Sequence, residues 1–160
     1  MIEKQFGKKR YVLDPELKEV ADAVYNKDKT YLSGDIGNIH IEYIKVYPNI
    51  SPTCAGRCVK SSKLLKFFSN PETDIVIEMS GELWDILTPG TKYILMLHEL
   101  MHIAISYKKD GEMVIGLQDH DIKDFRDIIK IYGIEWVETI KSITQSIHDF
   151  QNGEEEKISI

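Results

Sequence analysis

The sequence predicts one α+β domain, because β-branched runs typical of strands alternate with segments whose apolar residues recur at helical spacing. Residues 74–79 are rich in isoleucine and valine, and residues 39–43 alternate apolar and polar side chains, which favours a half-buried strand running on to Tyr47. Residues 134–150 carry apolar side chains every three or four positions, which predicts a C-terminal amphipathic helix. No linker-like stretch interrupts the chain, so we expect a single domain over residues 1–160.

Two residue pairs mark the starts of helices. Asp14-Pro15 and Thr88-Pro89 each place an N-cap residue before a proline at the first helical position. We expect the first helix to end near Asn26 and the second to run to about Ser106. Residues 58–68 fit no single assignment. The other expected elements are a strand at 11–13, a loop at 30–37, a short helix at 81–87, a turn at 108–111, a strand at 112–116, a helix at 119–132 and a frayed acidic tail at 151–160.

Composition excludes several classes of protein. Hydrophobic residues make up 42% and charged residues 29%, as in soluble globular domains, and the net charge of −6 argues against a nucleic-acid binder. Lys60, Lys63 and Lys66 recur every three residues, which predicts a solvated face and not a phosphate-binding stripe. No apolar run reaches the ~20 residues that span a bilayer and no signal peptide is evident, so we expect a cytoplasmic protein without membrane contact. Cys54 and Cys58, spaced C-x₃-C, are expected to be free thiols.

The central feature is the motif His98-Glu99-Leu100-Met101-His102, which reads H-E-x-x-H. On a helix, residues i and i+4 lie on one face, so the two imidazoles can bind one Zn²⁺ at ~2.0–2.1 Å each. Glu99 follows the first ligand, where a general base for water attack is needed. The motif lies within the apolar run 93–105, which predicts a buried helix whose polar groups need partners. A metal ion supplies them; the alternative is a buried His–Glu cluster without metal.

A catalytic zinc site needs a third protein ligand and one open position. The metzincin continuation is absent, because Ile105 and Lys108 stand where a glycine and a histidine belong. We favour His120, at a predicted helix start, as the third ligand. Asp124, one helical turn later, and less strongly Asp121, are candidates to accept the free N–H of a ligand imidazole. The choice of third ligand stays open between four residues: His120, Glu112, Asp121 and Asp124.

The sequence resembles the putative phage metallopeptidases, a family of small zincin-like proteins of phages and prophages. The likeness covers roughly residues 37–136 and rests on these pieces in order: the strand at 74–78, Trp84, the H-E-x-x-H helix, His120-Asp121-Ile122-Lys123-Asp124-Phe125 and Tyr132-Gly133-Ile134-Glu135-Trp136. The resemblance implies a metal-dependent peptidase. It also implies that His98, His102 and His120 are the metal ligands and that Glu99 is the base.

We therefore expect a zincin-like domain in which a small sheet packs on the H-E-x-x-H helix and a second helix supplies the third ligand. The expected activity is hydrolysis of a bond in a peptide or protein substrate by one Zn²⁺ and Glu99. A second hypothesis is a catalytically inactive, metal-stabilised protein that engages a host protein. A third is a SprT-like protease acting on DNA-bound proteins, against which the net charge of −6 speaks.

Overall fold

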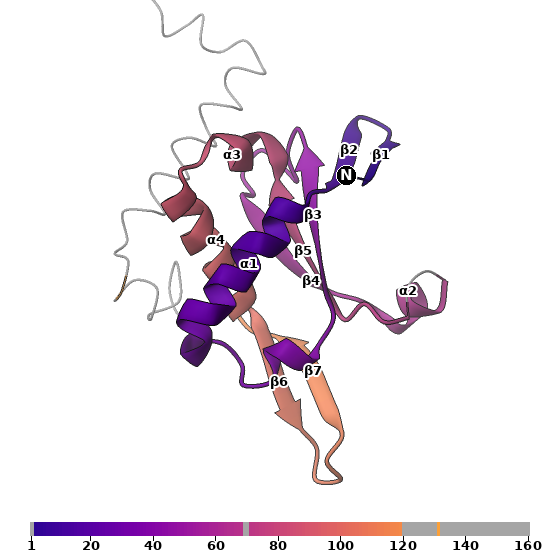
Figure 1. The fold of residues 1–160 in the computed structure, drawn as a ribbon. Coiled ribbons are helices and arrows are strands. Elements are labelled where there is room, and N and C mark those ends of the chain that lie inside the picture. The colour runs from indigo at the N-terminus through magenta and orange to yellow at the C-terminus, as the bar shows by residue number, and fades with distance from the viewer. Residues whose placement is uncertain (1, 69–70, 120–130, 132–160) are drawn as a thin grey trace, which may run out of the picture.

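A five-stranded mixed sheet forms the centre of the computed structural model, which describes residues 2–68, 71–119 and 131 (Figure 1). The strand order is β1-β2-β3-β5-β4. Strands β3 and β5 are parallel, and the other neighbouring pairs are antiparallel. This arrangement leaves β4 at one edge of the sheet. The strands are β1 (Ile2–Phe6), β2 (Lys9–Leu13), β3 (Ile41–Tyr47), β4 (Gly56–Lys60) and β5 (Ile75–Ser80).

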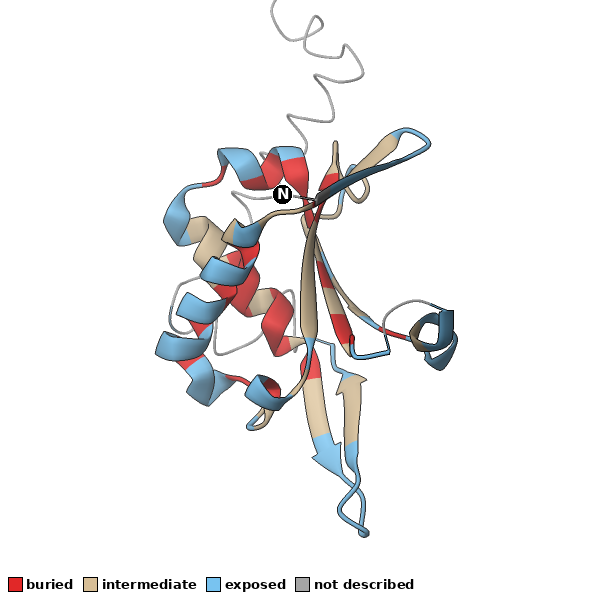
Figure 2. Cartoon of the chain, turned by 45° about the vertical axis from the view of Figure 1, so that its right-hand side comes forward, coloured by how far each residue is buried: buried red, intermediate tan, exposed pale blue. Residues whose placement is uncertain are grey.

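Two helices, α1 (Pro15–Asp28) and α4 (Pro89–Met101), lie together against one face of this sheet (Figure 1). Both begin as the sequence predicts: the Asp14 side chain accepts from the Glu16 N–H, and the Thr88 side chain accepts from the Thr91 N–H. Buried residues gather where the helices meet the sheet (Figure 2). The α+β class and the packing of the sheet on the motif helix are therefore confirmed. The remaining short helices of this layer are α3 (Gly81–Ile86), η1 (Lys29–Tyr31) and η2 (Ile36–Asn38).

A separate two-stranded sheet follows α4 and corrects one prediction. The helix expected to reach Ser106 ends at Met101, and β6 (Ile103–Tyr107) pairs with β7 (Met113–Leu117). The β-branched side chains of this segment favour a strand, and the Ser33 hydroxyl donates to the Ile103 carbonyl at 3.0 Å. Tertiary pairing thus outweighs the continued apolar pattern that predicted a longer helix.

The ambiguous segment 58–68 divides between the end of β4 and a short helix, α2 (Lys63–Phe68), which stands away from the body of the fold (Figure 1). Lys66 ties α2 to the body through an ion pair of 2.9 Å with Asp74. The apolar side chains of α2 remain exposed, as the blue colour of the helix shows (Figure 2). They are Leu64, Leu65, Phe67 and Phe68.

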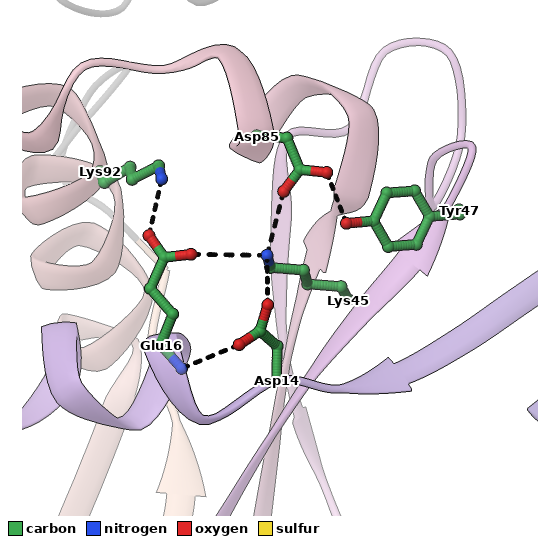
Figure 3. Close-up of polar contacts among 6 residues, drawn as sticks. All are labelled: Asp14, Glu16, Lys45, Tyr47, Asp85 and Lys92. Carbon is green, nitrogen blue, oxygen red and sulfur yellow. Dashed lines mark hydrogen bonds and ion pairs between the residues drawn. The ribbon is translucent and has the colours of Figure 1, made fainter. Parts of the chain in front are cut away.

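A buried lysine joins α1, β3 and α3 above the core (Figure 3). The Lys45 side chain is only 4% exposed, and its ammonium lies 2.7 Å from Asp14, 3.0 Å from Asp85 and 3.5 Å from Glu16. Glu16 in turn pairs with Lys92 on α4 at 2.6 Å. The network therefore fixes the first turn of α1 against the N-terminal half of the motif helix.

The ionisation of this network follows from its hydrogen bonds. The bond from Lys45 lowers the pKa of Asp14, and the bond from Lys92 lowers the pKa of Glu16, in each case against an opposing effect of burial. Burial acts to lower the pKa of Lys45, but its bonds to Asp14 and Asp85 outweigh burial and raise it. The charged forms of all three groups are therefore favoured near neutral pH.

Several predicted elements fall outside the described residues: the helix at 119–132 apart from its first residue and Ile131, the helix at 134–150 and the tail at 151–160. They stay predictions. Within the described part of the chain, no helix has the length and apolar character needed to cross a membrane.

Candidate metal centre

The last turn of α4 presents the motif residues to one side of the helix. His98 and Glu99 lie within α4, and His102 is its C-cap residue, still in helical conformation. The i, i+4 spacing predicted from the sequence is therefore preserved even though the helix stops there. Glu99 is 4% exposed, whereas the two histidines are half-buried. A buried carboxylate thus lies beside two half-buried imidazoles.

The two imidazoles have the separation that a tetrahedral metal ion requires. Their Nε2 atoms lie 3.3 Å apart, and the rings are inclined at 76°. Two nitrogens bound to one zinc ion at ~2.0–2.1 Å in tetrahedral geometry would lie about 3.3–3.4 Å apart. One ligand atom from each of His98, Glu99 and His102 lies within 4.8 Å of the others. The donor set and its spacing therefore fit a divalent cation such as zinc.

Gln118, just after β7, fixes the orientation of His102. The Gln118 carbonyl lies 2.7 Å from His102 Nδ1, and the Gln118 N–H donates to the His102 carbonyl at 2.7 Å. Its side-chain amide donates to the Met101 carbonyl at 2.7 Å and so caps α4. Because a carbonyl only accepts, Nδ1 carries the proton and Nε2 keeps its lone pair for a metal. Sequence reasoning missed Gln118, since a main-chain carbonyl is supplied by any residue type.

A hollow of about 360 Å³ opens over these side chains. Its walls are β4 on one side and the end of β7 on the other, and its lining residues are Gly56, Arg57, Cys58, His98, Glu99, His102, Leu117, Gln118 and Asp119. A Cβ on Gly56 would lie 3.0 Å from Glu99 Oε1. The glycine thus lets the edge strand approach the carboxylate closely, and no sequence signal marked this role.

The two cysteines flank the same wall but do not join the metal-binding group. Burial raises the pKa of Cys58 to about 12, and the charge of Glu99 adds to the effect. The pKa of Cys54 is raised by the same two causes. Both thiols are free, as predicted, and stay protonated near neutral pH, so neither resembles an activated nucleophile.

The third ligand is not settled by the described residues. His120, Asp121 and Asp124 all lie outside them, so their assignments stay predictions. Asp119, the residue before His120, lines the hollow. Glu112 lies in the loop that joins β6 to β7, at the end of the hairpin far from the hollow, where it pairs with Lys108 at 3.2 Å. Leu117, which lines the hollow, follows Glu112 by five positions, a rise of about 17 Å in a strand, so the geometry argues against Glu112 as a ligand.

Comparison with known families identifies one match. The model of the family described as putative phage metallopeptidase matches residues 9–144, which extends beyond the core of 37–136 that the sequence resemblance covers. A search of curated proteins and a search of solved structures each gave no match. The family match spans most of the chain and includes the two histidines and the glutamate that converge in the structure. The chain therefore belongs to the putative phage metallopeptidase family.

Proposed function

We propose that this chain is a zinc-dependent peptidase, encoded by a phage or prophage, that hydrolyses a peptide or protein substrate in the cytoplasm of the bacterial host. The observation that carries the proposal is the pair of Nε2 atoms 3.3 Å apart beside a buried carboxylate within 4.8 Å. The family match supports a metal-dependent peptidase. Two free cysteines are in keeping with a reducing compartment.

His98 and His102 would hold the ion through Nε2. His120 is the proposed third ligand, because it follows pocket-lining Asp119 directly and offers a third nitrogen donor. Asp124 and, less strongly, Asp121 are proposed to accept a ligand imidazole's N–H, as the Gln118 carbonyl does for His102. Three such ligands would leave a fourth coordination position for a water molecule or the substrate. This ligand arrangement is the zincin-like part of the proposal.

Glu99 is the proposed general base. A bound zinc ion would supply a Lewis acid for the scissile carbonyl and would lower the pKa of a bound water to ~7. Glu99 takes a proton from the attacking water, whose oxygen bonds to the carbonyl carbon. Glu99 then gives that proton to the amide nitrogen as the C–N bond breaks, which releases an amine and a carboxylic acid. Glu99 is buried, and one of its carboxylate oxygens lies within 4.8 Å of a ring nitrogen of each histidine.

Strand β4 is the proposed platform for the substrate. It is one of the two edge strands of the described sheet, so the side that does not face β5 presents main-chain N–H and C=O groups. An extended peptide can hydrogen-bond to such an edge. Because the main chain of β4 at Gly56 lies close to Glu99, a peptide bond paired with this edge would lie near the carboxylate.

Elemental analysis of the purified protein tests the metal assignment. We expect about one zinc ion per chain, and we expect His98→Ala, His102→Ala and His120→Ala each to lose it. Glu112→Gln should keep the metal and serves as the control. Retention of zinc by His120→Ala would move the third ligand to another residue, and a metal-free wild-type protein would overturn the proposal.

Turnover of a general protein substrate such as casein by the zinc-loaded protein tests the base. Glu99→Gln should keep its zinc and lose activity about 10²–10⁴-fold, the range typical of a general base. Glu19→Gln, an exposed acid on α1, should behave as wild type. Equal activity of Glu99→Gln and wild type would refute the role of Glu99. Zinc binding without any cleavage by the wild type would instead favour the catalytically inactive binding protein.

A further inference from the structure

A second hollow, of about 790 Å³, continues along the same two strands that wall the metal site. The site hollow touches the start of β4 and the end of β7, whereas the second hollow touches Lys60 at the end of β4 and Met113 at the start of β7. Side chains alternate along a strand, so Lys60 projects from the same face of β4 as Gly56, which faces Glu99. The distance from Gly56 to Lys60 is four residues, or about 13 Å of extended chain.

This second hollow, called the basic groove below, is lined by four lysines and two acids. Lys66 pairs with Asp74 at 2.9 Å and Lys108 pairs with Glu112 at 3.2 Å, so these charges are compensated. Lys60 and Lys63 are exposed, and no ion pair joins either of them to another residue in the part of the chain that the structure describes.

The charge of this region differs from that of the whole chain. Residues 51–71 contain no aspartate or glutamate, although the chain carries a net charge of −6. The solvated face predicted from the spacing of the lysines is therefore one wall of a hollow, built from the end of β4 and from α2. Two positive charges remain in it that an anionic ligand can neutralise.

We infer that the basic groove is a specificity subsite that binds an acidic side chain of the substrate, about four residues from the scissile bond. The inference rests on the proposed function, because that function places the scissile bond over Glu99. A peptide lying along β4 advances about 3.3 Å per residue, so its side chains three to five residues from Gly56 reach Lys60 and Lys63. Aspartate and glutamate are the side chains that these ammonium groups recognise.

Capture from a randomised nonapeptide library by zinc-loaded, immobilised Glu99→Gln protein tests the inference without turnover. We expect acidic residues to be enriched about tenfold among bound peptides at low ionic strength, as two partly exposed ion pairs would give. Adding Lys60→Gln and Lys63→Gln should abolish the enrichment. The matched control carries Lys4→Gln and Lys8→Gln instead, which change the net charge equally at two exposed lysines of the β1–β2 hairpin. This control should still enrich acidic peptides.

Absence of acidic enrichment, or equal loss in the control, would overturn the inference. Digestion of the same library by the wild-type protein shows whether a negative result concerns the subsite or the peptidase activity itself. Cleavage with aspartate or glutamate three to five residues from the cut supports both proposals. Cleavage without acidic preference overturns the subsite alone. Acidic enrichment without any cleavage overturns the peptidase and leaves the acid-binding groove standing.

Discussion

Replacing Lys45 with methionine tests how much the buried network contributes to the fold. Methionine keeps the unbranched apolar stem but removes the ammonium, which is bonded to Asp14 at 2.7 Å and to Asp85 at 3.0 Å and lies 3.5 Å from Glu16 (Figure 3). Three carboxylates then face one another without the cation between them. Like-charge repulsion and lost hydrogen bonds should both lower the free energy of unfolding.

The size of the loss follows from the exposure of the partners. Removing one member of a fully buried ion pair costs about 3–5 kcal/mol. The side chains of Asp14, Glu16 and Asp85 are 21%, 37% and 44% exposed, so water can solvate them once the lysine is gone. We therefore expect a smaller loss of about 2–3 kcal/mol, which in a chain of this size lowers Tm by about 4–12 °C.

Urea unfolding at pH 7, followed by circular dichroism, measures this loss. Lys18→Met is the matched control, because Lys18 also pairs with an aspartate, Asp22, at 3.0 Å but is 68% exposed. The control should change the free energy of unfolding by no more than about 0.5 kcal/mol. A Lys45→Met protein as stable as the control would refute the assigned role of the network.

Acid provides a second readout of the same network. The pKa values of Asp14 and Glu16 are lowered in the folded protein from ordinary values of 3.8 and 4.5. The native state therefore binds fewer protons than the unfolded state. The stabilisation is complete when the pH is above the ordinary pKa values of the two carboxyl groups, and it is lost as the pH falls through their lower pKa values in the folded protein. The stability gap between wild type and Lys45→Met should therefore narrow below about pH 4. A gap that stays constant from pH 7 to pH 3 would contradict this reasoning.

Three further predictions concern the site wall, the core and the thiols. Gly56→Ala should lower turnover about tenfold in steady-state kinetics at unchanged zinc content, because the added Cβ displaces the Glu99 carboxylate. Gly90→Ala is the control and should match wild type, because a Cβ at Gly90 meets open space. Leu97→Ala, in the fully buried part of α4, should cost about 2–5 kcal/mol in urea unfolding, whereas Ile86→Ala, 61% exposed, should cost less than about 0.5 kcal/mol. Burial raises the pKa of Cys58 to about 12, so iodoacetamide at pH 8 should label this thiol far more slowly in folded than in urea-unfolded protein. Equal labelling rates, measured by mass spectrometry, would contradict the raised pKa of Cys58.

The clustering of the H-E-x-x-H side chains and the helix starts could be predicted because local chemistry determines them. The i, i+4 spacing places His98 and His102 on one face of any helix, and the N-cap positions of Asp14 and Thr88 follow from side-chain hydrogen bonding. The end of α4 could not be predicted in this way. Ile103 continues the apolar pattern of the helix, and only its pairing with Leu117 makes it a strand residue.

Other parts of the site depend on contacts between residues distant in the sequence. Gly56 is close to Glu99 only because β4 pairs with β5 beside α4. Gln118 acts on His102 mainly through its main chain, which leaves no trace in residue type. The burial of Lys45 was likewise hidden, because an alternating strand predicts its polar positions to face solvent. Tertiary packing decides each of these, and periodicity in the sequence does not encode it.

The placement of β4 and β7 in two separate sheets has a mechanical consequence. Strand β4, on one side of the metal-site hollow, belongs to the five-stranded sheet. Strand β7, on the other side, belongs to a hairpin that is bonded at its base to Ser33 and, through Gln118, to His102. In the part of the chain that the structure describes, β4 and β7 share no ladder of hydrogen bonds, so a change in the distance between these two strands would break no strand pairing. The two strands can therefore adjust to side chains of different sizes beside the metal-binding residues.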